Sequence, residues 1–363
     1  MRQLNGYRIW TLNINCLVNH SSKLGLLEFL RRNDPDFLFL QEVNLLQPEL
    51  SEMIKPLRYS CYGNVTETGR GTAILWKESL IVTNLKIIVP DRIMSVDFGI
   101  YTFINVYGPS GRARRQERAE LYSINLNLYL AGIKKRVKVL GGDFNCIVEK
   151  RDAKNNASQK MCRELKVVLE TYDMIDAYRS VKPATDGFTF IRKNSASRID
   201  RLYISKSIVS SLNAADMIPA ACSDHNAVFI EIRDNTAAID METQSNRFSY
   251  WKFNNQALSS PDFDANFQDL YRRLLLRKQS YNAVTEWWEK CSKPLLRHFL
   301  INFSKLLSRE KRDTQDAMYF WLKEAVDKGV DDYEEATIIK HKIQGIYESD
   351  MEGVKVRSRY KEN

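Results

Sequence analysis

The sequence lacks the features that would mark a zinc-stabilised, secreted or membrane protein. Its cysteines form no CxxC pair and no CCHC cluster. The N-terminus has no basic segment followed by an apolar run, and no stretch approaches the ~20 apolar residues of a membrane span. We therefore expect a soluble, intracellular protein with reduced thiols and no membrane partner. The six cysteines are Cys16, Cys61, Cys146, Cys162, Cys222 and Cys291.

A polymerase motif is also absent, because no aromatic-x-Asp-Asp sequence falls on a strand-turn pattern. The pair Asp331-Asp332 precedes Tyr333 in the wrong order, and with Glu334 it forms a D-x-x-E signal for a helix start. No internal repeat is visible. The sequence thus offers no sign of a reverse transcriptase within these residues.

The chain does carry an excess of basic residues, which lies mainly in its first two-thirds. The formal net charge is +9 over 363 residues. Residues 1–240 hold 33 Lys and Arg against 26 Asp and Glu, whereas residues 241–363 hold 21 against 19. Because basic side chains neutralise phosphates and release counterions, this distribution favours a polyanion partner for the first part of the chain.

Strand-like and helix-like segments alternate up to about residue 233, which predicts an α/β layered domain. The strand-like runs are rich in β-branched, aromatic and leucine residues, and the helix-like segments repeat apolar residues at helical spacing. The expected strands are Tyr7–Asn13, Phe37–Gln41, Gly71–Lys77, Tyr101–Tyr107, Val137–Leu140 and Ala227–Ile232. The expected helices are Lys23–Arg31, Gln116–Leu130 and Gln159–Thr171.

The pattern then changes, and we expect three parts: a domain over residues 1–233, a linker over 234–246, and a helical region over 247–363. The linker is polar and lacks periodicity. Ser260-Pro261 is a typical helix start, with Ser as N-cap and Pro in the first turn. Further helices are expected over Tyr281–Cys291, Pro294–Leu307, Thr314–Asp327 and Asp331–Tyr347.

Polar residues fall where the predicted strands end, so their side chains can converge on one surface. They are Asn13, Glu42, Tyr107, Asp143, Asn145, Asp200, Asp224 and His225. Magnesium prefers oxygen ligands, and Glu42 can supply a carboxylate while Asn13 supplies an amide oxygen. The set therefore suggests a magnesium-dependent hydrolase.

Phosphodiester hydrolysis needs an activated water, neutralisation of developing charge and support for the leaving oxygen. Asp143 is a candidate base, and Asn145 and Tyr107 can donate to phosphate oxygens. His225 can do the same if Asp224 or another carboxylate accepts its second ring proton.

These residues sit in motifs whose order and spacing resemble the endonuclease/exonuclease/phosphatase superfamily. The match is more narrowly similar to the apurinic-type endonuclease domain at the front of non-LTR (LINE-type) retrotransposon polyproteins, and it covers roughly residues 5–233. The motifs are Thr11-Leu12-Asn13-Ile14-Asn15, Gln41-Glu42, Asn105-Val106-Tyr107-Gly108-Pro109, Gly142-Asp143-Phe144-Asn145, Ile199-Asp200-Arg201 and Ser223-Asp224-His225. Trp251-Lys252-Phe253-Asn254 and the tail Lys355–Arg359 resemble the connector that follows in such polyproteins.

The resemblance implies a four-layer α/β sandwich of two β-sheets flanked by helices, followed here by a mainly α-helical C-terminal region. It implies a Mg²⁺ or Mn²⁺ cofactor, single-step water attack and nicking of double-stranded DNA in the nucleus, after synthesis in the cytoplasm. Element RNA is a further candidate partner for the C-terminal region. Two alternatives are an apurinic/apyrimidinic repair endonuclease or other phosphodiesterase of the superfamily, and a non-catalytic nucleic-acid-binding derivative.

The resemblance also implies a role for each residue of the set. Asn13 and Glu42 would bind the metal, and Asp143 and Asn145 would handle the attacking water and the scissile phosphate. The remaining roles are phosphate contact by Tyr107 and His225, support of the metal or leaving group by Asp200, and orientation of His225 by Asp224. Cys16 stands where the family usually has glycine, so the turn after Asn13 is a point of departure.

Two segments are expected to contact DNA. One follows the Tyr107 motif and carries Arg112 and Arg114. The other is a predicted β-hairpin that runs from Thr185 to Arg198 and leads back to Asp200. Its expected contacts are Thr189, Arg192, Lys193, Ser197 and Arg198. The family resemblance implies that its tip enters a groove of the duplex beside the cut.

Overall fold

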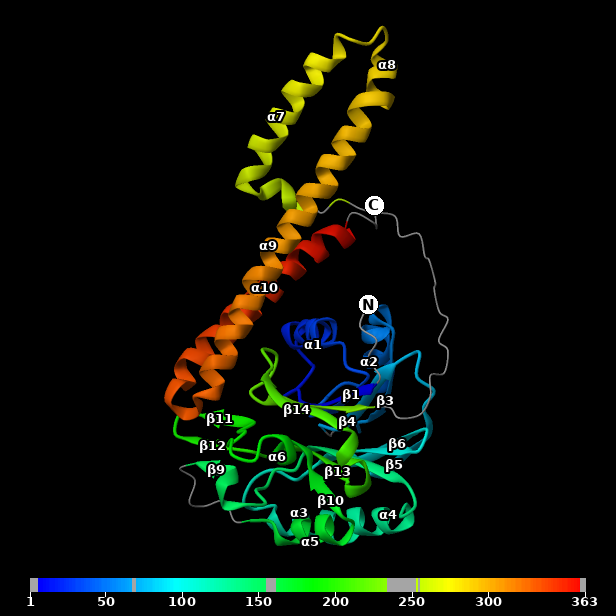
Figure 1. Ribbon diagram of the computed structural model, residues 1–363, viewed down its shortest axis with the longest axis vertical. Coiled ribbons are helices and arrows are strands. Elements are labelled where there is room, and N and C mark those ends of the chain that lie inside the picture. The colour runs from blue at the N-terminus through cyan, green and yellow to red at the C-terminus, as the bar shows by residue number, and fades with distance from the viewer. Residues whose placement is uncertain (1–5, 67–69, 155–160, 234–252, 254, 360–363) are drawn as a thin grey trace. The chain divides into compact units, whose positions relative to one another are not determined.

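The computed structural model describes residues 6–66, 70–154, 161–233, 253 and 255–359 (Figure 1). The chain divides into two compact units. The first combines Met1–Ala238 with Trp321–Ser349, and the second combines Ile239–Phe320 with Asp350–Asn363. The predicted linker 234–246 lies outside the described residues. The predicted division of the chain at residue 233 stays a prediction, but the first unit takes in part of the C-terminal helices.

The first unit is built on two six-stranded sheets that lie face to face (Figure 1). One sheet has the order β14-β15-β1-β2-β4-β3, and the other has the order β10-β13-β8-β7-β6-β5. The strands of the first sheet are β1 (Gly6–Asn13), β2 (Phe37–Gln41), β3 (Tyr59–Asn64), β4 (Thr72–Lys77), β14 (Leu212–Pro219) and β15 (Asn226–Arg233). Those of the second are β5 (Thr83–Val89), β6 (Ile93–Phe98), β7 (Tyr101–Tyr107), β8 (Val137–Asp143), β10 (Met174–Asp176) and β13 (Asp200–Ser205).

Strand β2 lies at the centre of the unit because its apolar sequence can be buried on both faces. Phe37 and Phe39 belong to the core between the sheets, whereas Leu38 and Leu40 belong to the core under the helices of the first sheet. Side chains alternate between the faces of a strand, so a continuous apolar run can bury both faces. All five residues of β2 are buried accordingly.

Helices cover the outer face of each sheet, which completes four layers (Figure 1). Asn19 caps α1 by accepting a hydrogen bond from the Ser22 amide at 2.8 Å. The helices on the first sheet are α1 (His20–Asn33) and α2 (Gln47–Ile54). Those on the second are α3 (Arg115–Glu120), the π-helical turn Leu121–Leu126, α4 (Asn127–Gly132) and α5 (Arg163–Thr171), with α6 (Ala177–Val181) following β10. The predicted four-layer sandwich is therefore confirmed.

A small third sheet stands beside the main sandwich, with the order β11-β12-β9. Its strands β11 (Phe190–Arg192) and β12 (Ser195–Ser197) form an antiparallel hairpin with Arg192 opposite Ser195, and β12 pairs with β9 (Ala153–Lys154). The predicted hairpin is confirmed.

A buried ion cluster lies beneath this hairpin and is centred on Asp152. Its carboxylate is fully buried and accepts from Arg198 at 3.0 Å, Arg201 at 3.0 Å and Arg179 at 3.2 Å. Arg198 also pairs with Asp176 at 2.6 Å. Because each buried charge has a partner, the cluster fixes the base of the hairpin rather than leaving an uncompensated ion.

The C-terminal region is helical, as predicted, but two of its expected helices are one. Helix α9 runs without a break over Lys293–Asp327, where the sequence suggested separate helices at Pro294–Leu307 and Thr314–Asp327. The intervening residues contain no Gly or Pro, and Arg309 pairs with Asp313 one turn on at 3.8 Å. The other helices are α7 (Pro261–Lys278), α8 (Val284–Trp287) and α10 (Tyr333–Arg359).

All six cysteines are free. In the part of the chain that the structure describes, no helix combines the length and apolar character that crossing a bilayer would require.

The Asp152 cluster predicts a specific acid sensitivity. Burial raises the pKa of Asp152, but the opposite effect of Arg201 and Arg198 is larger. The pKa of Asp152 in the folded state therefore lies well below its usual range. The unfolded pKa is higher, so the stabilisation is complete above about pH 4–5 and is lost as the pH falls further. Asp152→Asn should lower the free energy of unfolding by about 3–5 kcal/mol at pH 7, measured by urea denaturation, and should flatten its decline between pH 5 and 3.

A suitable control is Asp186→Asn, because Asp186 is exposed. We expect it to change the free energy of unfolding by less than about 0.5 kcal/mol. Equal effects of the two substitutions would contradict a structural role for the cluster.

Candidate active site

The polar residues that follow the strands meet at one edge of the sandwich because of the topology. Asn13 ends β1 and Glu42 follows β2, and these strands are parallel. Tyr107 and Asp143 end the parallel strands β7 and β8. Asp200 begins β13, which runs antiparallel to β8 and pairs Asp200 with Asp143.

Glu42 lies where the two sheets approach each other. Its Oε1 atom accepts from the Tyr107 hydroxyl at 2.9 Å and from Asn13 Nδ2 at 3.2 Å. Its Oε2 atom is paired with Arg70. Burial and the neighbouring Glu42 raise the pKa of Tyr107. The tyrosine therefore stays protonated and acts as a donor.

Asn13 connects the two carboxylates of the opposite sheets. Its Nδ2 also donates to Asp143 Oδ2 at 3.0 Å, while its Oδ1 accepts from the Asn15 amide at 3.0 Å. The NH₂ group thus faces Glu42 and Asp143. For Asn13 to act as the predicted metal ligand, its amide must turn so that the oxygen faces the carboxylates.

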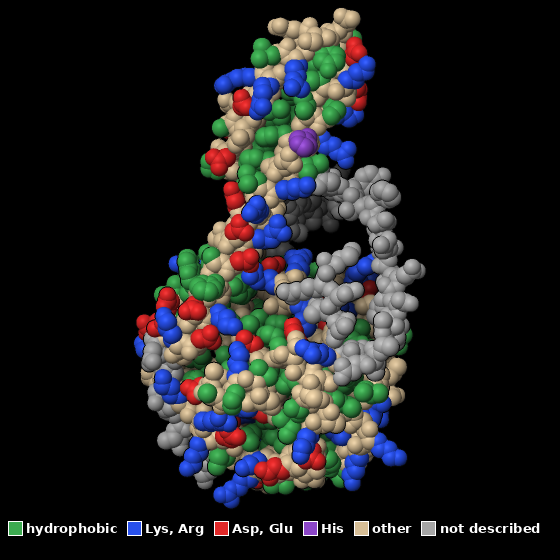
Figure 2. Space-filling model, viewed as in Figure 1, with side chains coloured by type: hydrophobic (Ala, Val, Ile, Leu, Met, Phe, Trp, Pro, Cys, Tyr) green, Lys and Arg blue, Asp and Glu red, His purple; other side chains and the backbone are tan. Residues whose placement is uncertain are grey.

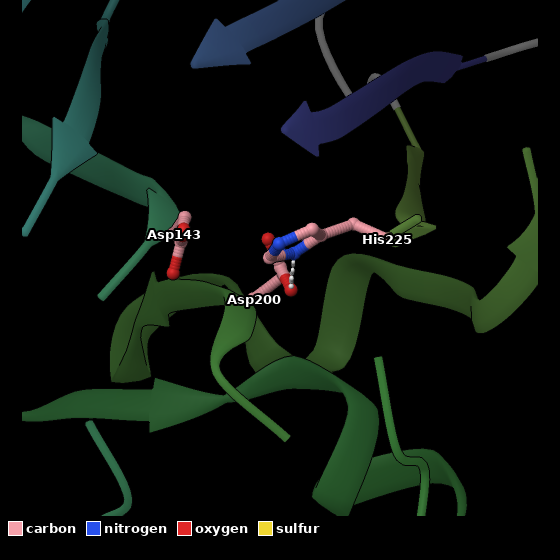
Figure 3. Close-up of side chains that lie close together, drawn as sticks. All are labelled: Asp143, Asp200 and His225. Atoms are coloured by element: carbon pink, nitrogen blue, oxygen red, sulfur yellow. Dashed lines mark hydrogen bonds and ion pairs between the residues drawn. The ribbon is translucent and has the colours of Figure 1, made fainter. Parts of the chain in front are cut away.

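Asp143, Asp200 and His225 form a buried group in which one ligand atom of each residue lies within 4.8 Å of the others (Figure 3). His225 Nδ1 is 2.9 Å from Asp200 Oδ2. Burial lowers the pKa of His225, but Asp200 raises it more, and the result is about 9. Burial and Asp200 raise the pKa of Asp143 to about 7.

The structure corrects the expected partner of His225. Asp224 is exposed, whereas Asp200 is buried and holds the imidazole Nδ1 atom. The tertiary fold brings Asp200 to the histidine because β13 starts beside it, and adjacency in sequence gave Asp224 no such contact. A carboxylate on Nδ1 leaves Nε2 available for a phosphate or a metal.

Asn145 faces the same site from the turn after β8. Its Nδ2 donates to Asp143 Oδ2 at 3.0 Å and to the Gly108 carbonyl at 2.9 Å. Gly142, the next-to-last residue of β8, has a φ of 143°, and a Cβ there would collide with the Val106 carbonyl oxygen. The glycine is therefore required for β8 to deliver Asp143 so close to β7.

These residues fit a divalent cation. Two buried carboxylates, Asp143 and Asp200, lie side by side, and Asp200 Oδ1 is buried without a hydrogen-bond partner. A third carboxylate, Glu42, lies on the other side of Asn13. Oxygen donors with one imidazole suit Mg²⁺ or Mn²⁺, and positive charge would relieve the repulsion that raises the pKa of Asp143.

The residues expected to contact DNA separate into buried and exposed groups. For Thr189, Ser197 and Arg198 the structure corrects the expectation, because all three are at most 3% exposed. The Thr189 hydroxyl accepts from the Ile199 and Asp200 amides at 3.1 Å, and Arg198 is held in the ion cluster. They stabilise the hairpin and are not placed to touch a ligand.

The other four residues, Arg112, Arg114, Arg192 and Lys193, are exposed. Arg192 lies over the Phe190 ring, with its guanidinium carbon 4.7 Å from the ring centroid, and Lys193 stands at the hairpin tip. Phe190 is also in ring contact with His225 at 4.8 Å, so this hairpin starts at the site itself. Arg112 and Arg114 are exposed in the loop after β7, where Arg114 pairs with Glu117.

Sequence reasoning missed two arginines at the site. Arg70 pairs with Glu42, and Arg92 lies over the Tyr107 ring, with its guanidinium carbon 4.7 Å from the ring centroid. Neither follows a predicted strand at the site, so no local signal pointed to them. Arg118, a basic neighbour of Arg112, is buried and donates to the Pro109 carbonyl, so it shapes the loop.

The turn after Asn13 contains the departure noted at Cys16. Asn15 and Cys16 have φ values of 51° and 79°, the left-handed region that glycine adopts without cost. The Cys16 amide donates to the Glu42 carbonyl at 2.9 Å. Cys16 is therefore held in a strained backbone conformation, in a turn whose hydrogen bond to Glu42 helps to fix the position of that residue.

The fold and this set of side chains suit the hydrolysis of a phosphate ester. The chain belongs to the endonuclease/exonuclease/phosphatase family, whose sequence model matches residues 10–225. The predicted family membership is therefore confirmed.

A relative is the Transposon TX1 uncharacterized 149 kDa protein of Xenopus laevis. It is 28% identical over 299 residues, which cover 77% of this chain and 22% of that protein. The chain therefore spans about a fifth of the length of this relative.

Two solved structures share the fold. One is an AP endonuclease from Archaeoglobus fulgidus, with a TM-score of 0.56 and 18% identity. The other is the 3′ phosphatase NExo from Neisseria bound to a product DNA hairpin, with a TM-score of 0.56 and 20% identity. Each match covers 62% of this chain and 99% of the solved one.

The strained turn yields a stability prediction. Cys16→Gly should raise the free energy of unfolding of the nuclease-family unit by about 0.5–1 kcal/mol, because relief of a left-handed φ exceeds the entropy cost of glycine. The unfolding temperature should rise by about 2–3 °C in scanning calorimetry. Cys16→Ala keeps the Cβ atom and should bring no such gain, so an equal gain in both variants would show that backbone strain is not the cause.

Proposed function

We propose that this chain is a divalent-metal-dependent endonuclease that nicks double-stranded DNA by direct attack of water. We further propose that it is the target-nicking part of a non-LTR retrotransposon protein and acts in the nucleus. The observation that carries the proposal is the buried group Asp143, Asp200 and His225 beside Glu42. The transposon protein among its relatives supports the biological setting.

Each residue of the group has a chemical role that suits hydrolysis of a phosphodiester. Asp143 lies within the buried group and can take the proton of the attacking water. His225, with a pKa of about 9, is a cation at pH 7 and can donate Nε2–H to a phosphate oxygen. Tyr107 and Asn145 are neutral donors that would turn from Glu42 and Asp143 to the same phosphate when it binds.

The metal would be held by Glu42, by Asn13 once its amide has turned, and by the carboxylates of Asp143 and Asp200. When bound, it supplies charge neutralisation at the phosphate and lowers the pKa of a bound water. The water forms the new P–O bond while the bond to the leaving oxygen breaks. Asp200 holds the His225 imidazole so that its positive charge stays at the phosphate.

The alternatives differ from the proposal in substrate or in activity. A repair endonuclease would require an abasic site, whereas a retrotransposon nickase cuts intact duplex. A non-catalytic nucleic-acid binder has no need of two buried acids around a histidine with a third acid beside Asn13. Binding of element RNA through the C-terminal helices stays a prediction.

Charge alone does not mark the DNA path. On the face drawn in Figure 2, Lys and Arg side chains are interspersed with Asp and Glu side chains over the first unit. The proposal therefore places the DNA by the site and by the hairpin that starts at Phe190, which is in contact with His225.

Substitution of Glu42 tests the activity. Glu42→Ala should lower the rate of supercoiled-plasmid nicking in Mg²⁺ by at least about a hundredfold, because it removes a carboxylate that would hold the metal, and a positioned charge in such a site contributes several kcal/mol. Circular dichroism should show an intact fold. Glu78→Ala removes an exposed acid and should cut at the wild-type rate. Metal-independent nicking by the wild-type chain, or full activity of folded Glu42→Ala, would refute the proposal.

The hairpin tip tests target selection. Arg192→Gln with Lys193→Gln should change which positions are nicked, mapped by sequencing the breaks, while metal-dependent cutting continues. The reason is that basic side chains at the tip respond to groove width and potential. Lys134→Gln with Lys135→Gln removes the same charge at exposed positions elsewhere and should leave the pattern unchanged. An unaltered pattern in the tip variant would contradict the hairpin's role.

A further inference from the structure

On its inner side, the loop that leads to His225 is fixed by hydrogen bonds of one serine. Residues 220–225 connect β14 to β15, and Ser223 donates its hydroxyl hydrogen to the Asn13 carbonyl. The same hydroxyl oxygen accepts from the His225 amide at 2.9 Å. Ser223 therefore sets where the backbone of His225 lies relative to strand β1, which carries Asn13.

The same loop is held from outside by helix α10. Lys340 Nζ donates to the Ser223 carbonyl at 2.9 Å, and Gln344 Nε2 donates to the Ala221 carbonyl at 2.9 Å. These residues are four apart and so lie on one face of the helix. The loop residues Ala221 and Ser223 are buried, which leaves their carbonyls dependent on protein donors.

Other contacts join this part of the helices to the rest of the first unit, but they are weaker. Lys323 in α9 pairs with Asp216 of β14 at 3.3 Å. Lys193 at the hairpin tip pairs with Glu334, and both side chains are nearly three-quarters exposed. Exposed pairs contribute little. The two contacts with the loop carbonyls are therefore the ones that bear on the site.

We propose that α10 is a positioning element for the active-site histidine. Lys340 and Gln344 hold the outer side of the loop while Ser223 holds its inner side, and together they fix His225 against Asp200. This inference rests on the proposed function for its kinetic consequence. Its structural consequence, the geometry of the His225–Asp200 contact, is independent of activity.

The kinetic test uses the full chain and the double substitution Lys340→Met with Gln344→Ala. We expect kcat for plasmid nicking in Mg²⁺ to fall about tenfold, with KM changed less than about twofold, because a displaced donor loses transition-state contact more than binding. Lys342→Met removes the same charge from an exposed position on the same helix and should match wild type. Lys340→Arg keeps a donor and should recover most of the rate.

The structural test follows the four histidines of the chain by ¹⁵N-histidine NMR, with the His225 signal assigned from a His225→Gln variant. The His225 Nδ1 signal should shift or broaden in the double variant and should remain unchanged in Lys342→Met. Gln344→Ala alone provides a milder variant if the double substitution fails to fold, as judged by circular dichroism.

The two tests separate failure of the proposed function from failure of the positioning role of α10. If the wild-type chain does not nick DNA, the proposed function fails and the NMR comparison alone decides the positioning role. An unchanged His225 signal in a folded variant overturns the inference. Wild-type kcat in the double variant, or a loss confined to KM, overturns it equally.

Discussion

A buried amide contact between the two sheets is the constraint on which the site depends. Gln41 Nε2 donates to Asn105 Oδ1 at 2.7 Å, and Asn105 Nδ2 donates to the carbonyls of Leu40 and Ala73 at 2.9 and 2.8 Å. A slip of one residue in either sheet would leave these buried groups unpaired. Glu42 follows Gln41, and Tyr107 lies two residues after Asn105. The same contact therefore brings the Tyr107 hydroxyl to 2.9 Å from Glu42 Oε1.

Charge at the site is arranged differently from charge in the supporting structure. Asp152 is surrounded by arginines, so its pKa is lowered and it stays ionised as a structural anion. Asp143 is buried and has another carboxylate, Asp200, beside it, so its pKa rises to about 7. The contrast separates an acid that stabilises the fold from one that can exchange a proton.

Much of the fold and most of the site residues could be predicted from the sequence. The strand over Phe37–Gln41 and the hairpin around Arg192 follow from local patterns that their own residues determine. The burial of some hairpin residues could not be predicted from the sequence. Arg198 is buried because it pairs with Asp152, which lies 46 residues earlier in the chain. The continuity of α9 was missed because a charged stretch without apolar residues looks like a break.

What the sequence determined by itself is the set of chemical groups and the strands that carry them, because strand periodicity and strand-end position are local properties. Only the tertiary structure decided which groups meet. Asp200 rather than Asp224 holds His225, since strand β13 starts beside the histidine while Asp224 points to solvent. Lys340, more than a hundred residues from Ser223, reaches the same loop only because α10 folds back onto it. Such contacts depend on packing between distant segments, and no local pattern encodes them.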